Sequence, residues 1–232
     1  SRKRTRKKQE ASKTRKCAMI FSFNKDAEKK EETSTPSEEI TTKNASDPRI
    51  IGICGDLDEE KAGDLMYGIM ALLDDGTTYT IKNPDSENPD IKINYEPFEF
   101  VISTLGGSAQ EMFGLHDLMR AVREKCEIHT VGLGKVFSAG TLLLASGSKG
   151  HRKIGKNCRV MIHSVISGNH GSIHNLENEM DEIRWVQDRY IEAMVSETNM
   201  SKSHLKKILN RKVNAYFTAE EAVELGIADI IF

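Results

Sequence analysis

Apolar residues along the chain fall into two recurring patterns, short continuous runs and longer stripes with three- and four-residue spacing. The run RIIGIC at 49–54 ends at Gly55 and is typical of a buried strand. The next segment, 58–73, places apolar residues at Ala62, Leu65, Met66, Ile69, Met70 and Leu73. These steps put them on one face of a helix. The folded part of the chain is therefore predicted to begin near Pro48 with a strand and an amphipathic helix.

The same alternation of strand and helix patterns continues toward the C-terminus. We predict further strands at 98–103, 128–133 and 160–163, and helices at 109–125, 138–145 and 172–198. Two alternating segments, 77–81 and 91–95, flank the polar sequence NPDSENPD and predict a hairpin with a long loop. Strands that alternate with helices form β-α-β units, so we predict an α/β fold with mostly parallel strand pairing.

Charge is distributed unevenly between the N-terminal region and the rest of the chain. The 232 residues include 33 basic and 35 acidic residues, a formal net charge of −2. Nine of the basic residues but only one acid, Glu10, fall within 1–16. Residues 24–47 are rich in Glu, Lys, Ser and Thr and have few apolar residues to offset chain entropy. We therefore predict a disordered extension over 1–48, basic and then polar, followed by one folded domain over 49–232.

The basic arm at 1–16 has more than one interpretation. It is either a solvated tail or a segment that docks onto an acidic partner or contacts phosphates. A nucleic-acid partner is disfavoured because the arm contains no interleaved aromatic residues and the rest of the chain is acidic. Docking onto an acidic protein partner is the functional hypothesis that we retain.

Composition and spacing exclude several classes of protein. No window approaches ~18 consecutive apolar residues, so we predict no transmembrane helix and no membrane partner. We find no secretory signal pattern, and none of the four cysteines forms a CxxC pair, which disfavours a zinc finger and favours a reducing, cytoplasmic location. The histidines form no HExxH motif, so we predict no metal site.

Candidate chemistry falls at the ends of predicted strands. Gly106 and Gly107 follow the strand at 98–103 and form either a tight turn or a loop with amides open to an anion. Ser138 precedes an apolar helix, where a serine is either an N-cap or a nucleophile presented at the helix N-terminus. His163 ends a strand, where an ordinary core or surface histidine and a catalytic base are the alternatives.

Four segments, taken in order, resemble the ClpP family of proteolytic subunits. They are LGGS at 105–108, GKVFSAGTLLLASGSKGHR at 134–152, RVMIHSV at 159–165 and FTAEEAVELGIAD at 217–229. The resemblance extends from about Arg49 to Phe232. It implies a crotonase/ClpP-like α/β fold of repeated β-α-β units, with the helix at 172–198 as a protruding handle.

The resemblance also implies roles for individual residues. Ser138 would be the nucleophile and His163 the general base, a pairing used by serine proteases. The backbone amides of Gly107 and Ala139 would form the oxyanion hole. Asn214 stands where the family has the aspartate of the triad, at a longer spacing from His163 than the family expects. The nearby Asn210 therefore remains an alternative third member.

A serine endopeptidase that hydrolyses unfolded polypeptides inside a ring-shaped chamber is the function that the resemblance implies. Its partners would be further copies of the chain in two stacked heptameric rings and an AAA+ unfoldase of the Clp type. ATP would be used by that unfoldase, and we expect no cofactor in this chain. A catalytically weak or inactive ring subunit or adaptor is the alternative that Asn214 keeps open. An enoyl-CoA hydratase-like enzyme of the same fold is disfavoured by the paired Ser138 and His163.

Overall fold

The computed structural model describes residues 48–82, 90–211 and 213–232, all of which belong to one compact unit that spans 45–232. The predicted extension over 1–48 and the polar loop of the hairpin therefore lie almost entirely outside the described residues. Because residues 83–89 and 212 are not described, the prediction of one domain over 49–232 stays a prediction.

Nine strands are described. They are β1 (Ile50–Cys54), β2 (Thr77–Lys82), β3 (Asp90–Tyr95), β4 (Phe98–Thr104), β5 (Ile128–Phe137), β6 (Lys153–Ile154), β7 (Arg159–Ile162), β8 (Ala215–Phe217) and β9 (Ile230–Ile231). Strands β2 and β3 form the predicted antiparallel hairpin. The other seven form one sheet with the order β1-β4-β5-β6-β9, and β7 pairs with both β5 and β8. Only the β7–β8 pair of this sheet is antiparallel, so the predicted α/β fold with mostly parallel pairing is confirmed.

Strand β5 is longer than the sequence predicts. The expected strand ended at 133, whereas β5 continues to Phe137. Gly134, at φ +65°, divides the strand into two segments. Up to Gly132 the strand pairs with β4 and β6, and from Lys135 onward it pairs with β7 and, at Val136 after a register shift, again with β4. The glycine allows this change of direction because φ > 0 costs it little, and the second segment carries the chain to Ser138.

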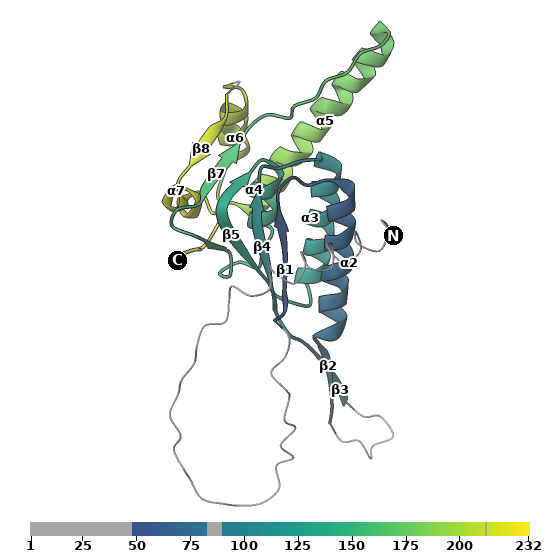
Figure 1. Cartoon of the computed structure of the whole chain (residues 1–232), viewed down its shortest axis with the longest axis vertical. Coiled ribbons are helices and arrows are strands. Elements are labelled where there is room, and N and C mark those ends of the chain that lie inside the picture. Colours follow the sequence, from purple (N-terminus) through teal and green to yellow (C-terminus); the bar gives the residue numbers. More distant parts are fainter. Residues whose placement is uncertain (1–47, 83–89, 212) are drawn as a thin grey trace, which may run out of the picture. The chain divides into compact units, whose positions relative to one another are not determined.

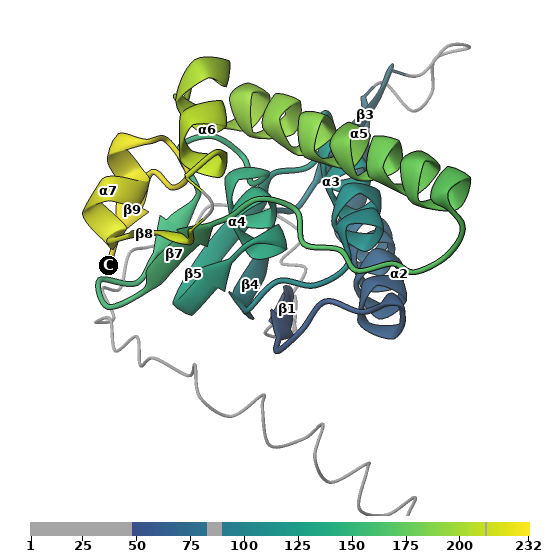
Figure 2. The ribbon, with the colours of Figure 1, turned by 90° about the horizontal axis from the view of Figure 1, so that it is seen from above.

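Six helices are described. They are α2 (Glu59–Asp75), α3 (Ala109–Arg123), α4 (Ala139–Ala145), α5 (Ile173–Glu197), α6 (Lys202–Leu209) and α7 (Ala219–Glu224). Helices α2 to α5 lie on one side of the sheet, with α5 crossing over α3 and α4 (Figure 2). The predicted stripes contribute residues to a single core cluster, and every residue of α4 is buried.

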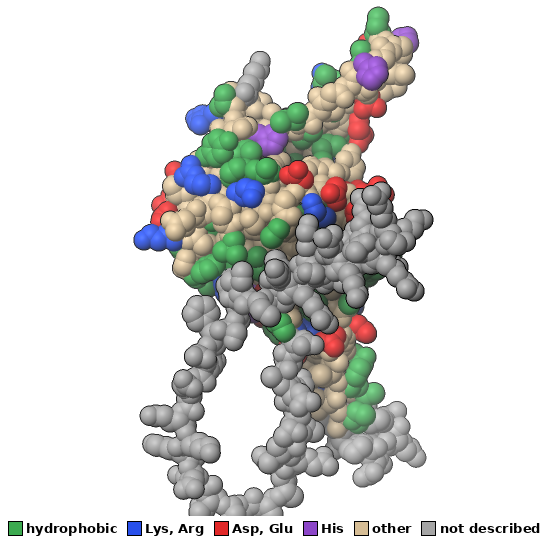
Figure 3. All heavy atoms as spheres, viewed as in Figure 1, with side chains coloured by type: hydrophobic (Ala, Val, Ile, Leu, Met, Phe, Trp, Pro, Cys, Tyr) green, Lys and Arg blue, Asp and Glu red, His purple; other side chains and the backbone are tan. Residues whose placement is uncertain are grey.

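Helix α5, the predicted handle, is buried over only part of its length. Its C-terminal half contributes Val186, Tyr190 and Met194 to the buried residues, whereas the apolar Leu176 and Met180 of its N-terminal half are exposed. That half extends away from the sheet (Figure 1), and acidic side chains gather along it on the face shown in Figure 3. The stretch 163–171 before it forms no strand. Within the described ranges, no helix is long and apolar enough to span a membrane.

Candidate active site

Ser138 occupies the N-cap position of α4 but does not act as a cap. The other five described helices begin with a side chain that accepts a hydrogen bond from the first turn, as Ser108 and Thr218 do. The side chain of Ser138 makes no such bond. Of the two sequence-based interpretations of this serine, the N-cap is therefore the one that the geometry disfavours.

The backbone of Ser138 adopts a conformation that serine rarely occupies. It has φ 54° and ψ −117°, and it is the single non-glycine residue with positive φ in the described part of the chain. The conformation is held by a hydrogen bond from the Ser138 amide to the Met161 carbonyl, 2.8 Å long, and by the buried helix that follows. A residue held in such a region costs on the order of 1–3 kcal/mol, and such residues concentrate at active sites.

The loop with Gly106 and Gly107 packs directly against this serine. A Cβ on Gly106 would lie 2.7 Å from the Ser138 Cβ and 3.1 Å from its Oγ, so a larger residue would displace the hydroxyl. Gly107 sits even closer to Leu57, whose carbonyl oxygen a Cβ would overlap. The backbone bonds between these segments run from the Leu57 amide to Gly106 and from the Ser108 amide to Leu57, and they leave the Gly107 amide unused.

The sheet register brings His163 beside Ser138. Strand β7 pairs in parallel with the end of β5, and Phe137 lies opposite Met161 as the last pair. Ser138 and His163 thus follow the carboxyl ends of two adjacent parallel strands, where functional residues of α/β proteins meet.

Asn214 directly precedes β8, the strand that pairs with β7. Strands β7 and β8 pair antiparallel, with Ile162 opposite Ala215. Extending this register by one residue would put Asn214 opposite His163. Its side chain is exposed, however, and its amide nitrogen donates a 3.4 Å hydrogen bond to the Tyr216 hydroxyl. The alternative residue Asn210 is exposed at the C-cap of α6. Neither asparagine has a hydrogen bond to the His163 ring among the described residues.

A cavity of about 540 Å³ opens beside Ser138. Ser138, Ala139, Gly107 and His163 all line it, so four of the five site residues predicted from the sequence share one pocket. Asn214, the fifth, is not among its lining residues. The pocket is also lined by residues from the loop after His163 and by one face of α5.

Three polar residues of α5 in this pocket were missed by the sequence analysis. Glu179 and Glu182 line it and form no ion pair with any other described residue, and no Lys or Arg lines the pocket. Tyr190 lines it from deeper inside, and its buried hydroxyl has no hydrogen-bond partner in the described part of the chain. Burial raises the pKa of Tyr190, which keeps the hydroxyl protonated. A stripe along a predicted helix says which residues share a face, but not which pocket they line.

Comparison with known proteins identifies relatives of this chain. The model of the Clp protease family matches residues 85–232. An ATP-dependent Clp protease proteolytic subunit 1 of Prochlorococcus marinus is 32% identical over 147 residues, which are 63% of this chain and 71% of that protein. The protein of the same name from Corynebacterium diphtheriae is 30% identical over 185 residues, 79% of this chain and 78% of its own length. The alignment with a second Prochlorococcus marinus strain, 33% identical, spans 64% of that relative.

Proposed function

The chain belongs to the Clp protease family, and on that premise we propose that it is a proteolytic subunit that cleaves unfolded polypeptides with Ser138 as the nucleophile. The observation that carries this proposal is the strained, uncapped serine, packed against Gly106 in a pocket that it shares with His163. Membership of a protease family supports peptide-bond hydrolysis as the reaction. The serine mechanism is our inference from the geometry.

The proposed reaction assigns a step to each residue. His163 takes the proton of the Ser138 hydroxyl as the oxygen attacks the peptide carbonyl, and later gives it to the leaving amine. The amides of Gly107 and Ala139 stabilise the oxyanion that forms. The unused Gly107 amide and the position of Ala139 at the head of α4 support this assignment. Water then attacks the acyl group while His163 accepts its proton, and His163 returns the proton to Ser138 Oγ as the acyl–oxygen bond breaks and the carboxylic acid leaves.

Asn214 is proposed as the residue that orients the His163 ring. An amide oxygen can accept the proton of the ring nitrogen, as in Cys-His-Asn enzymes, but it does not neutralise the imidazolium. The turnover of the wild-type protein is therefore expected to be limited at this position. The register of β7 and β8, which would place Asn214 opposite His163 if extended by one residue, supports this proposal.

Replacing Asn214 with Asp is expected to raise peptide hydrolysis by roughly tenfold or more, because a carboxylate stabilises the charged ring. The measurement is kcat on a short fluorogenic peptide. Asn210→Asp is the matched control, since it adds the same charge at the end of α6. A gain in Asn210→Asp alone would reassign the third position to Asn210, and no gain in either variant would remove both asparagines from the mechanism.

The pocket chemistry supports a preference for basic substrate side chains. Two unpaired carboxylates, Glu179 and Glu182, lie on the pocket wall, and the Tyr190 hydroxyl lacks a partner within it. A lysine or arginine side chain brings an apolar stem and a charged end that suit these groups. We propose that peptides with Lys or Arg before the scissile bond are cleaved faster than peptides with Leu.

The double variant Glu179→Gln and Glu182→Gln is expected to lower kcat/KM for a lysine peptide by roughly three- to tenfold, the size of screened surface attractions. Hydrolysis of the matching leucine peptide should be unchanged. Glu177→Gln is the control, because Glu177 lies on the same helix and pairs with His174 outside the pocket. An equal loss on both peptides would indicate a structural effect and contradict the charge preference.

Assembly into two stacked heptameric rings, fed by a Clp-type AAA+ unfoldase, is the quaternary structure that we propose. The relatives are named as proteolytic subunits of an ATP-dependent protease. The exposed apolar residues of α5, Leu176 and Met180 with the half-exposed Trp185, support burial of this helix against another copy.

A further inference from the structure

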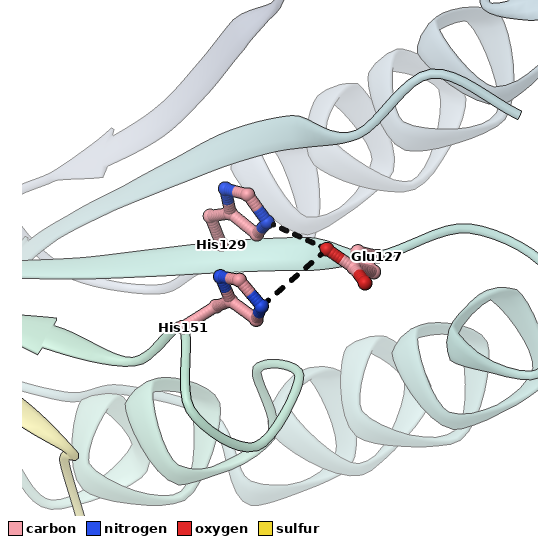
Figure 4. A group of neighbouring side chains, drawn as sticks. All are labelled: Glu127, His129 and His151. Atoms are coloured by element: carbon pink, nitrogen blue, oxygen red, sulfur yellow. Dashed lines mark hydrogen bonds and ion pairs between the residues drawn. The ribbon is translucent and has the colours of Figure 1, made fainter.

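Three side chains with metal-binding atoms meet at the end of β5 that is remote from Ser138. Glu127 precedes the strand, His129 is its second residue, and His151 comes from the loop before β6. Figure 4 shows both imidazole rings turned toward the Glu127 carboxylate. Short motifs along the chain predicted no metal site. The fold, however, brings His151 next to His129, which lies 22 positions earlier.

The distances between these atoms are close to those of a metal coordination shell. Glu127 Oε2 lies 3.0 Å from His129 Nε2 and 3.6 Å from His151 Nε2, and the three ligand atoms all lie within 4.8 Å of one another. Around tetrahedral Zn²⁺, with bonds of 2.0–2.2 Å, neighbouring ligand atoms are separated by about 3.3 Å. The two rings are stacked, with centroids 4.3 Å apart and planes inclined by 5°. A modest rotation about the broad terminal torsion of each histidine would let both nitrogens converge on one ion.

The backbone holds these side chains in place without a metal. His129 is paired with Glu99 across β4 and β5. The His151 amide donates to the Ser148 carbonyl, and the next residue, Arg152, is tied by its side chain and backbone to Asp229. The ligands are therefore preorganised. They are also accessible, since the His129 side chain is 21% exposed and the side chains of His151 and Glu127 about half.

The donor atoms of the three side chains suit a transition-metal cation. Two imidazoles and one carboxylate match ions of borderline softness, such as Zn²⁺, Ni²⁺ or Cu²⁺, better than Mg²⁺ or Ca²⁺, which prefer oxygen ligands. The described residues supply three protein ligands, which leaves a fourth position for water.

We propose that Glu127, His129 and His151 form a binding site for one divalent transition-metal ion, with Zn²⁺ as the representative ligand. The ion would tie the loop before β6 to the start of β5. Because His163 and the serine lie at the other end of β5, the site would act on stability rather than on the peptidase reaction. The proposal is therefore independent of the proposed serine mechanism.

The test is isothermal titration of the full chain with Zn²⁺ after removal of bound metal with a chelator. We expect one ion per chain with a micromolar or tighter Kd, and a rise in Tm of roughly 5 °C at a hundredfold excess over Kd. His151→Ala and Glu127→Gln change partly exposed side chains and should fold normally, which circular dichroism verifies. His151→Ala should weaken binding at least 100-fold, and Glu127→Gln at least tenfold.

Matched controls separate this cluster from other zinc ligands. His204→Ala removes an exposed histidine of α6, His163→Ala removes the pocket histidine, and Cys54→Ser removes an exposed thiol. All three should bind Zn²⁺ as the wild-type protein does. The proposal is overturned if the wild-type protein binds no zinc at 100 μM, which would leave Glu127 as an acceptor for the two histidines alone. It is also overturned if His151→Ala binds as tightly as the wild type.

Discussion

Replacing Ser138 with alanine is expected to lower peptide hydrolysis by at least ~10⁴-fold, because the proposed reaction has no other nucleophile. The same change should abolish covalent labelling by a fluorophosphonate probe. Removing one hydroxyl leaves the Cβ and the tight contact with Gly106 in place, so the variant should keep the fold and the assembly of the wild-type protein. A labelling time course, with size-exclusion chromatography alongside, measures both properties.

Ser164→Ala is the matched control for this experiment. Ser164 lines the same pocket and directly follows His163, so its loss changes the surroundings but not the proposed nucleophile. Labelling that persists in Ser138→Ala would refute the assignment. A large wild-type assembly that does not label would instead favour an inactive ring subunit, in which Asn214 fails to position the His163 ring. A folded monomer would contradict the proposed rings.

The family resemblance, rather than the strand pattern, predicted that Ser138 and His163 act together, and the strand pairing explains how they line one pocket. Ser138 and His163 each follow an apolar run, and parallel pairing of these runs places both residues at one edge of the sheet. The uncapped geometry of Ser138 was not predictable, because a serine before an apolar helix is usually a cap. Its positive φ arises from tertiary contacts, including the bond from its amide to Met161.

Contacts between distant segments account for what the sequence did not predict. The bend of β5 at Gly134 depends on two different partner strands, which a run of apolar letters does not reveal. Glu182 and Tyr190 face the pocket because α5 crosses over α3 and α4, as Figure 2 shows. Asn214 stays a prediction as the third member of the triad, because it directly precedes β8 and its side chain donates to the Tyr216 hydroxyl rather than to His163.

A buried ion network at the C-terminal end of α5 is expected to make the stability of the protein depend strongly on pH. Glu197 is 3% exposed and accepts two hydrogen bonds from Arg123, 2.9 and 2.8 Å long. Its carboxylate also lies 3.2 Å from His116 and 3.8 Å from Lys149. Burial alone would raise the pKa of Glu197, but the hydrogen bonds from His116 and Arg123 and the charges of Arg123 and Lys149 lower it to about 2.

The stability of the protein is therefore expected to fall in acid. The pKa of Glu197 is depressed from 4.5 to about 2 on folding, so its contribution is complete above about pH 4.5 and is lost as the pH falls toward 2. A shift of this size corresponds to on the order of 3 kcal/mol. Asp229 adds to the same trend. Burial raises its pKa, but the hydrogen bonds from Arg152 lower it by more, so the net shift of its pKa is downward. Urea unfolding at pH values from 3 to 7 measures this loss.

Replacing Glu197 with Ala should lower the free energy of unfolding by roughly 3–5 kcal/mol at pH 7, because it leaves Arg123 near a cavity without its carboxylate. Glu192→Ala is the control, since Glu192 lies on the same helix in exposed ion pairs with Arg189 and Lys202 and should cost less than about 1 kcal/mol. The acid-induced loss should shrink in Glu197→Ala and remain in the control. An unchanged pH profile in Glu197→Ala would mean that other carboxylates dominate the acid-induced loss of stability.

The same variant should also affect the pocket. Glu197 connects the C-terminal end of α5 to Arg123 of α3, and α5 carries the pocket residues Glu182 and Tyr190. Its loss should therefore loosen the position of α5, and KM for peptides should rise under conditions in which the protein is still folded.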